Sequence, residues 1–329
     1  MANSADFVWM DGEIVPWERA TIHVSAETVL RGANVFEGMR AYWRPDRDQL
    51  YIFRIEDHLR RLRQSAKIMR MTIPYSDAEL TAAFIELIQR NRFRDNVHFR
   101  PVVYFDHGEA NAWLPDEIRT GVFVLAYSRP TSRASMEGIQ SCTSTWRRNS
   151  DVSSPSRIKA AGNYHNSRLA HVEARINGFG MPVMLNEHGK VSEGPSSCLM
   201  LVRDGVVITP GSSADILESI TRDTLIRLFR EMGVPVVERD VDRTELYIAD
   251  ELFFCGSGAE VLPVRSIDHY PVGDGEVGPL TRRIRARYFE VAQGLVPEYT
   301  HWVLPVFGPG EPREPLHSAV SGLAAPAAE

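Results

Sequence analysis

Residues 157–164 read Arg-Ile-Lys-Ala-Ala-Gly-Asn-Tyr and contain one of only three lysines in the 329-residue chain. The small residues after Lys159 would let a bulky ligand approach the backbone closely, and no acidic neighbour in sequence pairs with this lysine. A lysine desolvated in such a place has a lowered pKa and can form a Schiff base. By composition alone, a lysine in a flexible surface loop is the commoner outcome, so the surrounding sequence has to decide.

The other two lysines have ordinary interpretations. Nearly all of the 37 basic residues are arginines, which cannot lose a proton in a protein and so cannot act as amine nucleophiles. Lys67 falls on the polar side of a helical pattern that runs from Asp57 to Met71, and Lys190 follows a turn signal at residues 186–189. Both are predicted to be exposed charges, which leaves Lys159 as the candidate nucleophile.

Composition limits the possible partners and location. The chain is 43% hydrophobic and 24% charged with a net charge of −6, which gives no reason to expect nucleic acid or an anionic membrane as a partner. It has no 18-residue apolar run and no signal-peptide pattern. Three widely spaced cysteines, Cys142, Cys198 and Cys255, suit neither a disulfide framework nor a zinc site. We therefore predict a cytoplasmic protein without a bound metal.

The first 128 residues are predicted to form a small α+β domain. Asp11-Gly12 between two apolar runs is a hairpin signal, and Ser76 with Glu79 three residues later is a capping box that opens a helix. The strands expected here are 7–10, 13–17, 38–43, 50–53, 97–105 and 121–127, and the helices are 57–71 and 76–88.

Residues 129–137 are polar and turn-rich and are predicted to be an interdomain linker. A larger domain is expected over residues 138–307, with a barrel-like core of short antiparallel strands and helices outside. Its expected helices are 167–176, 221–232 and 279–291, and its expected strands are the hairpins 183–191 and 199–208 followed by 234–239 and 251–255. Residues 308–329 are rich in Pro, Ala, Gly and Ser, which predicts a disordered tail.

Four segments after Lys159 have the features of one site for a phosphate-bearing cofactor. Tyr164 can donate a hydrogen bond, and Glu193 would emerge rigidly at a strand end. Residues 219–223 begin a helix, whose exposed amides and dipole attract anions, and residues 256–260 could form an anion nest of backbone amides. Each feature also has a structural alternative: Tyr164 as a core aromatic, Glu193 as a hairpin-end charge, and residues 219–223 as a simple helix cap. Residues 256–260 are weak evidence for a site when taken alone.

Together, in this order and spacing, the segments resemble the fold-type IV pyridoxal-phosphate-dependent aminotransferases, most closely the branched-chain amino acid aminotransferases. The matching stretches, within residues 7–303, are 31–40, 58–62, 99–101, 159–164, 192–194, 218–223 and 278–281. Any one stretch is weak, but the collinear set is highly specific. The resemblance implies an α+β fold of two domains, a small α+β domain and a larger barrel-like α/β domain, with the cofactor between them. It also implies at least a homodimer whose subunits complete each other's sites.

The resemblance also implies roles for individual residues. Lys159 would be the catalytic residue that holds pyridoxal 5'-phosphate as a Schiff base and moves the proton. Tyr164 would bond the ring O3′, and Glu193 would pair with the protonated pyridine nitrogen. The phosphate would be bound by Arg61, the amides of Ile220 and Thr221, and Ser257. The substrate would be met by Arg31, Phe36, His98, Arg100 and Gly258.

The implied reaction is a ping-pong transfer of an amino group from an amino acid or amine to a keto acid, both small molecules. A transaminase for D-amino acids or (R)-amines, or a lyase resembling aminodeoxychorismate lyase, are the alternatives. A non-enzymatic binding protein is a remote one, because Lys159 and Glu193 are both present.

The chain departs from the branched-chain pattern mainly on the substrate side. Arg31 and His98 each stand where those enzymes carry Tyr, residues 108–112 replace a glycine-rich loop, Gly258 follows Ser257 where Ala follows Thr, and Cys198 replaces Asn. Arg31, His98 and Arg100 could form a more cationic pocket suited to a carboxylate. Alternatively, Arg31 pairs with Glu37, and His98 is a satisfied core histidine.

Overall fold

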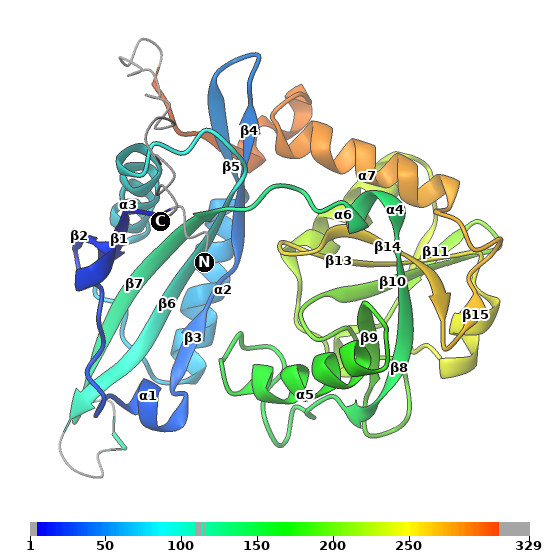
Figure 1. Ribbon diagram of the computed structural model, residues 1–329, viewed down its shortest axis with the longest axis horizontal. Coiled ribbons are helices and arrows are strands. Elements are labelled where there is room, and N and C mark those ends of the chain that lie inside the picture. Colours follow the sequence, from blue (N-terminus) through cyan, green and yellow to red (C-terminus); the bar gives the residue numbers. More distant parts are fainter. Residues whose placement is uncertain (1–4, 109–112, 115, 309–329) are drawn as a thin grey trace, which may run out of the picture.

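The computed structural model describes residues 5–108, 113–114 and 116–308, whose strands form two eight-stranded sheets side by side (Figure 1). The first sheet has the order β16-β5-β4-β6-β7-β1-β2, with β3 pairing β6. Its strands are β1 (Phe7–Met10), β2 (Glu13–Pro16), β3 (Asn34–Phe36), β4 (Met39–Arg44), β5 (Gln49–Phe53), β6 (Val97–Gly108), β7 (Ile118–Ser128) and β16 (Val303–Pro305). Its helices are α1 (Glu27–Arg31), α2 (Ile55–Ile68) and α3 (Asp77–Arg90).

Local signals in the first 128 residues are confirmed. Asp11 and Gly12 both have positive φ, 48° and 99°, as the tight turn of the β1–β2 hairpin requires. Ser76 caps α3, and both bonds of its capping box with Glu79 are present.

The second sheet has the order β12-β11-β10-β13-β14-β8-β9, with β15 pairing β14. Its strands are β8 (Ile139–Arg147), β9 (Met181–Leu185), β10 (Cys198–Arg203), β11 (Val206–Thr209), β12 (Val236–Glu238), β13 (Glu251–Gly256), β14 (Glu260–Ile267) and β15 (Tyr270–Pro271). Its helices are α4 (Ala134–Glu137), α5 (Asn163–Ile176), α6 (Ile220–Glu231) and α7 (Pro279–Ala292), and four short 3-10 helices cover 17–19, 212–214, 243–248 and 297–302.

This sheet is mixed, whereas the sequence was expected to give antiparallel strands. β8 runs parallel to both β9 and β14, and β11 runs parallel to β12. The turn expected within 183–191 is present, since Asn186 donates its N–H to the carbonyl of Lys190 and Ser192 donates to that of Met184. The returning chain is irregular, with Leu185 and Val191 as a single bridge, and β9 pairs along its other edge with β8. The hairpin over β10 and β11 is confirmed.

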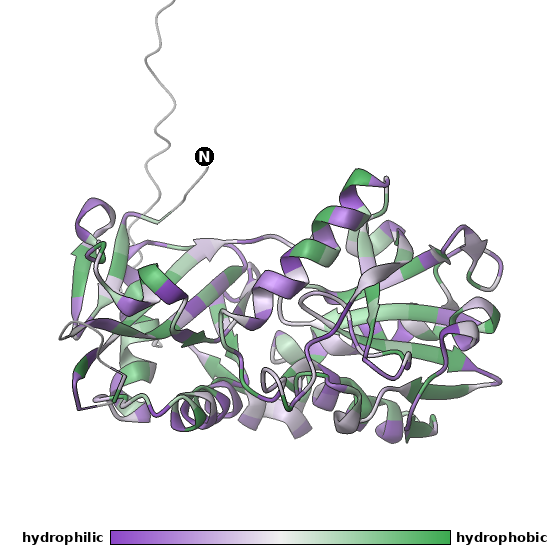
Figure 2. Ribbon diagram, turned by 90° about the horizontal axis from the view of Figure 1, so that it is seen from below, coloured by the Kyte–Doolittle hydropathy of each residue, from purple (hydrophilic) through white to green (hydrophobic). Residues whose placement is uncertain are grey.

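The central strands of the second sheet, β10 and β13, are buried on both faces. Along β10, Cys198 and Met200 pack into one core beneath α6 and α7, whereas Leu199 and Leu201 pack into another. A strand covered on both sides has a continuous apolar sequence, and the buried strands are coloured largely hydrophobic in Figure 2 while helices alternate. None of the described helices is long and apolar enough to cross a membrane.

The two sheets are joined by more than the linker. The phenols of Tyr42 in β4 and Tyr288 in α7 are 2.9 Å apart in the buried core. β16 returns to pair with β5, so residues 303–305, which the sequence analysis assigned to the larger domain, belong to the first sheet. The boundaries at 128 and 138 stay a prediction, and the expected tail lies outside the described residues except for Gly308.

Candidate active site

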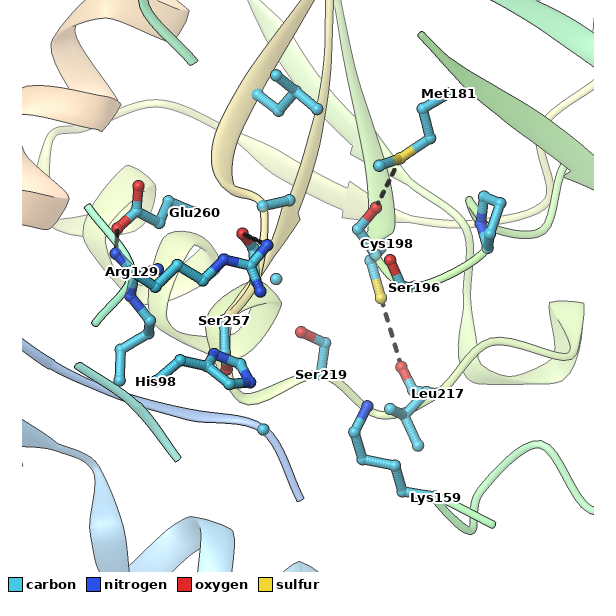
Figure 3. Close-up of a pocket in the computed structure, with 18 of the residues that line it drawn as sticks. His98, Arg129, Lys159, Met181, Ser196, Cys198, Leu217, Ser219, Ser257 and Glu260 are labelled. Carbon is cyan, nitrogen blue, oxygen red and sulfur yellow. Dashed lines mark hydrogen bonds and ion pairs between the residues drawn. The ribbon is translucent and has the colours of Figure 1, made fainter. Parts of the chain in front are cut away.

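Residues from both sheets line one cavity of about 270 Å³ (Figure 3). Of the residues predicted from the sequence, those that line it are Arg61, Lys159, Tyr164, Glu193, Ser257, Phe36, His98, Arg100 and Gly258. The structure therefore brings together residues that lie between positions 36 and 258 of the chain.

The backbone of the lysine segment is fixed to the first sheet. Phe36 donates its N–H to the carbonyl of Lys159 and Ala161 donates to the carbonyl of Asn34, both at 3.0 Å, and Val35 bridges Ala160. The N–H of Lys159 donates to Ser65 Oγ in α2 at 3.1 Å. The segment before α5 thus pairs antiparallel with β3, which sets the root of the Lys159 side chain between the two sheets.

The Lys159 amine lies among aromatic groups. Its Nζ donates to the Tyr164 hydroxyl at 2.6 Å and lies 5.1 Å from the ring centres of both Phe36 and Tyr164. Among the residues that the structure describes, no carboxylate forms an ion pair with it. Lys67 is exposed, as expected, and Lys190 is partly exposed and pairs with Asp242 at 2.7 Å. Lys159 is thus the lysine of the cavity.

Glu193 is a buried carboxylate held by an arginine that sequence reasoning missed. Arg148 Nη2 lies 2.8 Å from Glu193 Oε1, and both side chains are 5% exposed. The amide of Leu217 donates to the same oxygen at 3.3 Å, and the Cys198 thiol lies 3.5 Å from the other. Burial raises the pKa of Glu193, and Arg148 opposes that rise. Glu193 does lie at the end of a hairpin, since its carbonyl accepts from Met184 N–H, but its carboxylate is buried and lines the cavity instead of being a solvated charge.

Arg61 belongs to a second buried ion cluster. Its Nε and Nη2 donate to the two oxygens of Glu37 at 2.6 and 2.7 Å, and its Nη1 donates to the carbonyl of Glu218 at 2.7 Å. His58 Nδ1 lies 2.8 Å from the same carboxylate. Burial alone would raise the pKa of Glu37, but Arg61 and His58 hold it well below its usual range. The alternative pairing of Glu37 with Arg31 is wrong.

The expected phosphate end is formed around the start of α6. Ser219 caps this helix, accepting from Arg222 N at 3.2 Å, and lines the cavity. Ile220 and Thr221 occupy its first turn but their residues do not line the cavity. Their amides are among the first four N–H groups of the helix, which have no acceptor within it and favour anions. Ser257 lines the cavity from the turn between β13 and β14.

One face of the first sheet supplies the opposite wall. Arg40 in β4 pairs in register with His98 in β6, and Arg100 lies two residues on, so all three side chains project from the same face. Arg40 forms a buried ion pair with Glu260, 2.8 Å apart. The Arg100 guanidinium lies 4.7 Å from the centre of the Phe36 ring.

His98 is buried, but it is not a satisfied core histidine. Neither ring nitrogen has a hydrogen-bond partner in the described part of the chain. Burial and the charges of Arg129, Arg100 and Arg40 lower its pKa to about 2, so the ring is neutral. The hydrogen-bonding capacity of both ring nitrogens is therefore unused by the described residues.

Arg31 does not line this chain's cavity. It ends α1, its side chain is 43% exposed, and it forms an i,i+4 ion pair with Glu27. Its guanidinium lies 5.2 Å from the centre of the Trp113 ring. The expected contact of Arg31 with a substrate would then have to be made in the site of a neighbouring subunit, and it stays a prediction. Most of the loop at 108–112, where the other departure was noted, lies outside the described residues.

The residues present fit pyridoxal phosphate. The cavity combines a lysine amine without an acidic partner, a phenol beside it, a buried carboxylate and a cationic end at the start of a helix. These groups match the aldehyde, phenolic oxygen, ring nitrogen and phosphate of the cofactor. A buried Glu193 and a buried Arg61 each need a residue of opposite charge, and the structure shows these to be Arg148 and Glu37. No local sequence pattern identifies such distant partners.

Fold and site together define an enzyme that uses pyridoxal phosphate, and comparisons with known proteins agree. Residues 34–267 match the family model for amino-transferase class IV, and the chain belongs to this family of pyridoxal-phosphate-dependent transaminases. It is 38% identical to a probable branched-chain-amino-acid aminotransferase of Aquifex aeolicus, over 92% of this chain and 98% of that one.

Solved structures give the same result. The branched-chain amino acid aminotransferase of Thermobaculum terrenum in its PLP-form is 42% identical, with a TM-score of 0.86 over 94% of this chain and 100% of that one. The branched-chain aminotransferase of Thermoproteus uzoniensis with norvaline is 37% identical, with a TM-score of 0.86 over 92% and 99%. The predicted fold class, cofactor and transaminase activity are confirmed.

The Glu37 cluster predicts a specific acid response. A carboxyl whose pKa is lowered in the folded state stabilises the protein above its unfolded value of 4.5, and this contribution is lost as pH falls below that value. Glu37→Gln leaves Arg61 buried without its charge partner and should cost about 3–5 kcal/mol at neutral pH. Urea unfolding should then show a weaker loss of stability below pH 4.5 in the variant than in the wild type. Parallel pH profiles would contradict this role.

Proposed function

We propose that this transaminase moves an amino group between an aliphatic amino acid of the branched-chain type and a keto acid. The observation that carries the proposal is the Lys159 amine, which has no acidic partner among the described residues and shares a cavity with the buried Glu193. The substrate class comes from the relatives, which are named for branched-chain amino acids.

The contacts described above support a proposed role for each residue. Bound in the cavity, pyridoxal phosphate supplies the carbonyl that takes up the amino group and the ring that stabilises the resulting carbanion. Lys159 Nζ holds the cofactor and then carries the proton that leaves the substrate carbon. Tyr164, 2.6 Å from that nitrogen, orients the amine. Glu193 keeps the ring nitrogen protonated, with Arg148 holding the carboxylate in place.

We propose roles for the residues at the phosphate and substrate ends as well. Arg61, Ser257 and the amides of Ile220 and Thr221 bind the phosphate as an anion at a helix start. On the substrate side, Phe36 packs against the Tyr164 ring, with ring centres 4.9 Å apart, and Arg100, His98 and Gly258 meet the polar groups of the substrate.

We also propose a cytoplasmic homodimer in which Arg31 reaches the neighbouring site. Several large apolar side chains are exposed on or near α1 and on α5: Val24, Val29, Leu30, Trp113, Leu114, Leu169, Val172 and Ile176. Gly32, which ends α1, lies close to His165 of α5, so the two helices adjoin. Exposed apolar side chains gathered in this way favour a protein contact.

Lys159→Ala should abolish transamination, because Ala offers neither a Schiff base nor a proton carrier. Borohydride reduction of the wild-type holoenzyme should fix the cofactor on the peptide that contains Lys159. Lys67→Ala is the matched control and should keep both activity and label. A label on the Lys67 or Lys190 peptide would remove Lys159 from the assignment.

Glu193→Gln keeps the shape of the side chain but removes its charge. We expect kcat to fall by roughly 10²-fold or more, because stabilisation of the developing carbanion is lost. The absorbance spectrum of the bound cofactor should shift as its ring nitrogen loses its proton. An unchanged kcat and spectrum would make Glu193 a structural residue only.

Arg31→Tyr tests the dimer. If Arg31 binds a substrate carboxylate in the neighbouring site, the variant should raise KM for 2-oxoglutarate and pyruvate roughly tenfold or more. KM for an amine donor that has no carboxylate should stay unchanged. Sedimentation should show a dimer for both proteins. If Arg31 serves only its contacts with Glu27 and Trp113, the melting temperature falls and all KM values stay alike.

A further inference from the structure

Arg129 is held rigidly at the cavity wall. It follows β7 directly, its N–H donates to the carbonyl of Asn96 at 2.7 Å, and its Nη2 donates to the carbonyl of Gly258 at 3.1 Å. The first bond ties it to the first sheet and the second to the turn between β13 and β14. Figure 3 draws its guanidinium inside the cavity near His98 and Ser257. The group is thus placed in advance and loses little freedom on binding a ligand.

The positive charge of Arg129 has no negative partner in the part of the chain that the structure describes. The two carboxylates that line the cavity are both committed, Glu193 to Arg148 and Glu260 to Arg40. Glu260 also accepts from Thr131 at 3.3 Å. Arg129 uses one of its five N–H donors on the Gly258 carbonyl, and none of its nitrogens is among the buried atoms without a partner. Arg129 is partly exposed and lines the cavity, so its remaining donors are not committed to the protein.

A second unpaired guanidinium, that of Arg100, lines the same cavity. No described carboxylate is within ion-pair distance of it, and its Nε is buried without a hydrogen-bond partner. Between these arginines His98 stays neutral, since burial, followed by Arg129 and Arg100, lowers its pKa to about 2. Two uncompensated arginines in a partly desolvated cavity are poised for anions, because each can form parallel hydrogen bonds with a carboxylate.

The phosphate of the cofactor does not account for both. Its expected site lies around Arg61, Ser257 and the start of α6, whereas Arg100 projects from β6 and Arg129 from the end of β7. An amino or keto acid with one carboxylate satisfies one of these arginines. A substrate with a second carboxylate satisfies the other.

We propose that Arg129 is a specificity-determining residue that binds the second carboxylate of a dicarboxylic amino or keto acid, while the first is met elsewhere in the cavity. The inference rests on the proposed transaminase function and adds to it a residue that selects the dicarboxylic partner of the reaction.

Arg129→Met removes the charge and keeps an apolar stem of comparable length. KM for 2-oxoglutarate should rise roughly 10- to 100-fold, since hydrogen bonds to charged groups are typically worth that factor. KM for 4-methyl-2-oxopentanoate, which has one carboxylate, should change by less than about threefold. Arg133→Met is the matched control: Arg133 lies in the same segment, its side chain is 87% exposed, and it pairs with Glu137 on the surface. It should leave both KM values unchanged.

Binding without turnover gives a second readout. Calorimetry on the holoenzyme should show that Arg129→Met weakens the binding of glutarate roughly 10- to 100-fold and changes the binding of 4-methylvalerate little. Arg129→Lys keeps the charge but loses the forked guanidinium, so it should weaken the binding of glutarate by a smaller factor. This variant serves as the test if Arg129→Met does not fold. Equal losses for both acids would assign Arg129 to the first carboxylate or to holding the turn at Gly258, and would overturn the proposal. Unchanged glutarate binding would overturn it too.

These outcomes are separate from failure of the function itself. A wild type that transaminates no amino donor would remove the proposed function. Selective loss of glutarate binding in Arg129→Met would still locate the carboxylate site.

Discussion

The site depends on three residues of backbone pairing between residues 34–36 and 159–161. This short antiparallel contact attaches the chain just before α5 to β3 of the first sheet. It fixes the root of Lys159 without using its side chain, so the amine remains available for chemistry. The carboxylate that faces the lysine across the cavity comes from the second sheet, and the distance between them is set by how the sheets pack. Any change that separates the sheets also separates Lys159 from Glu193.

Charge pairing decides which groups stay free for ligands. Three carboxylates, Glu37, Glu193 and Glu260, are buried beside the cavity, and each is matched by one arginine. Burying a carboxylate without a partner would be far more costly than burying the pair. An arginine is suited to this role because its fork engages both oxygens and its charge persists. Arginines thus hold the buried carboxylates, and the Lys159 amine is left without an ion pair among the described residues.

Sequence patterns predicted what local spacing encodes. Lys159, Tyr164 and Glu193 were found because each lies in a short recognisable segment, and the β1–β2 hairpin and the start of α3 were found from their turn and cap residues. Pairs such as Arg40 with Glu260, 220 residues apart, depend on strand register across two sheets, which no local pattern carries. β8 was missed because its polar, alternating sequence is only half buried, and its parallel pairing with β9 and β14 depends on the topology of the chain.

The imidazole at position 98 shows how the cavity tolerates its cations. A protonated His98 would place a further positive charge beside Arg40, Arg100 and Arg129, in a position that is 2% exposed. Burial and these three arginines prevent this by lowering its pKa to about 2. Two neighbours confine the ring. The ring centre of Tyr127 lies 5.2 Å from that of His98, and a Cβ added at Gly38 would lie only 3.3 Å from the imidazole Cε1. A neutral imidazole has one hydrogen-bond donor and one acceptor, as a phenol has, so His98 keeps both functions on this wall without adding a charge.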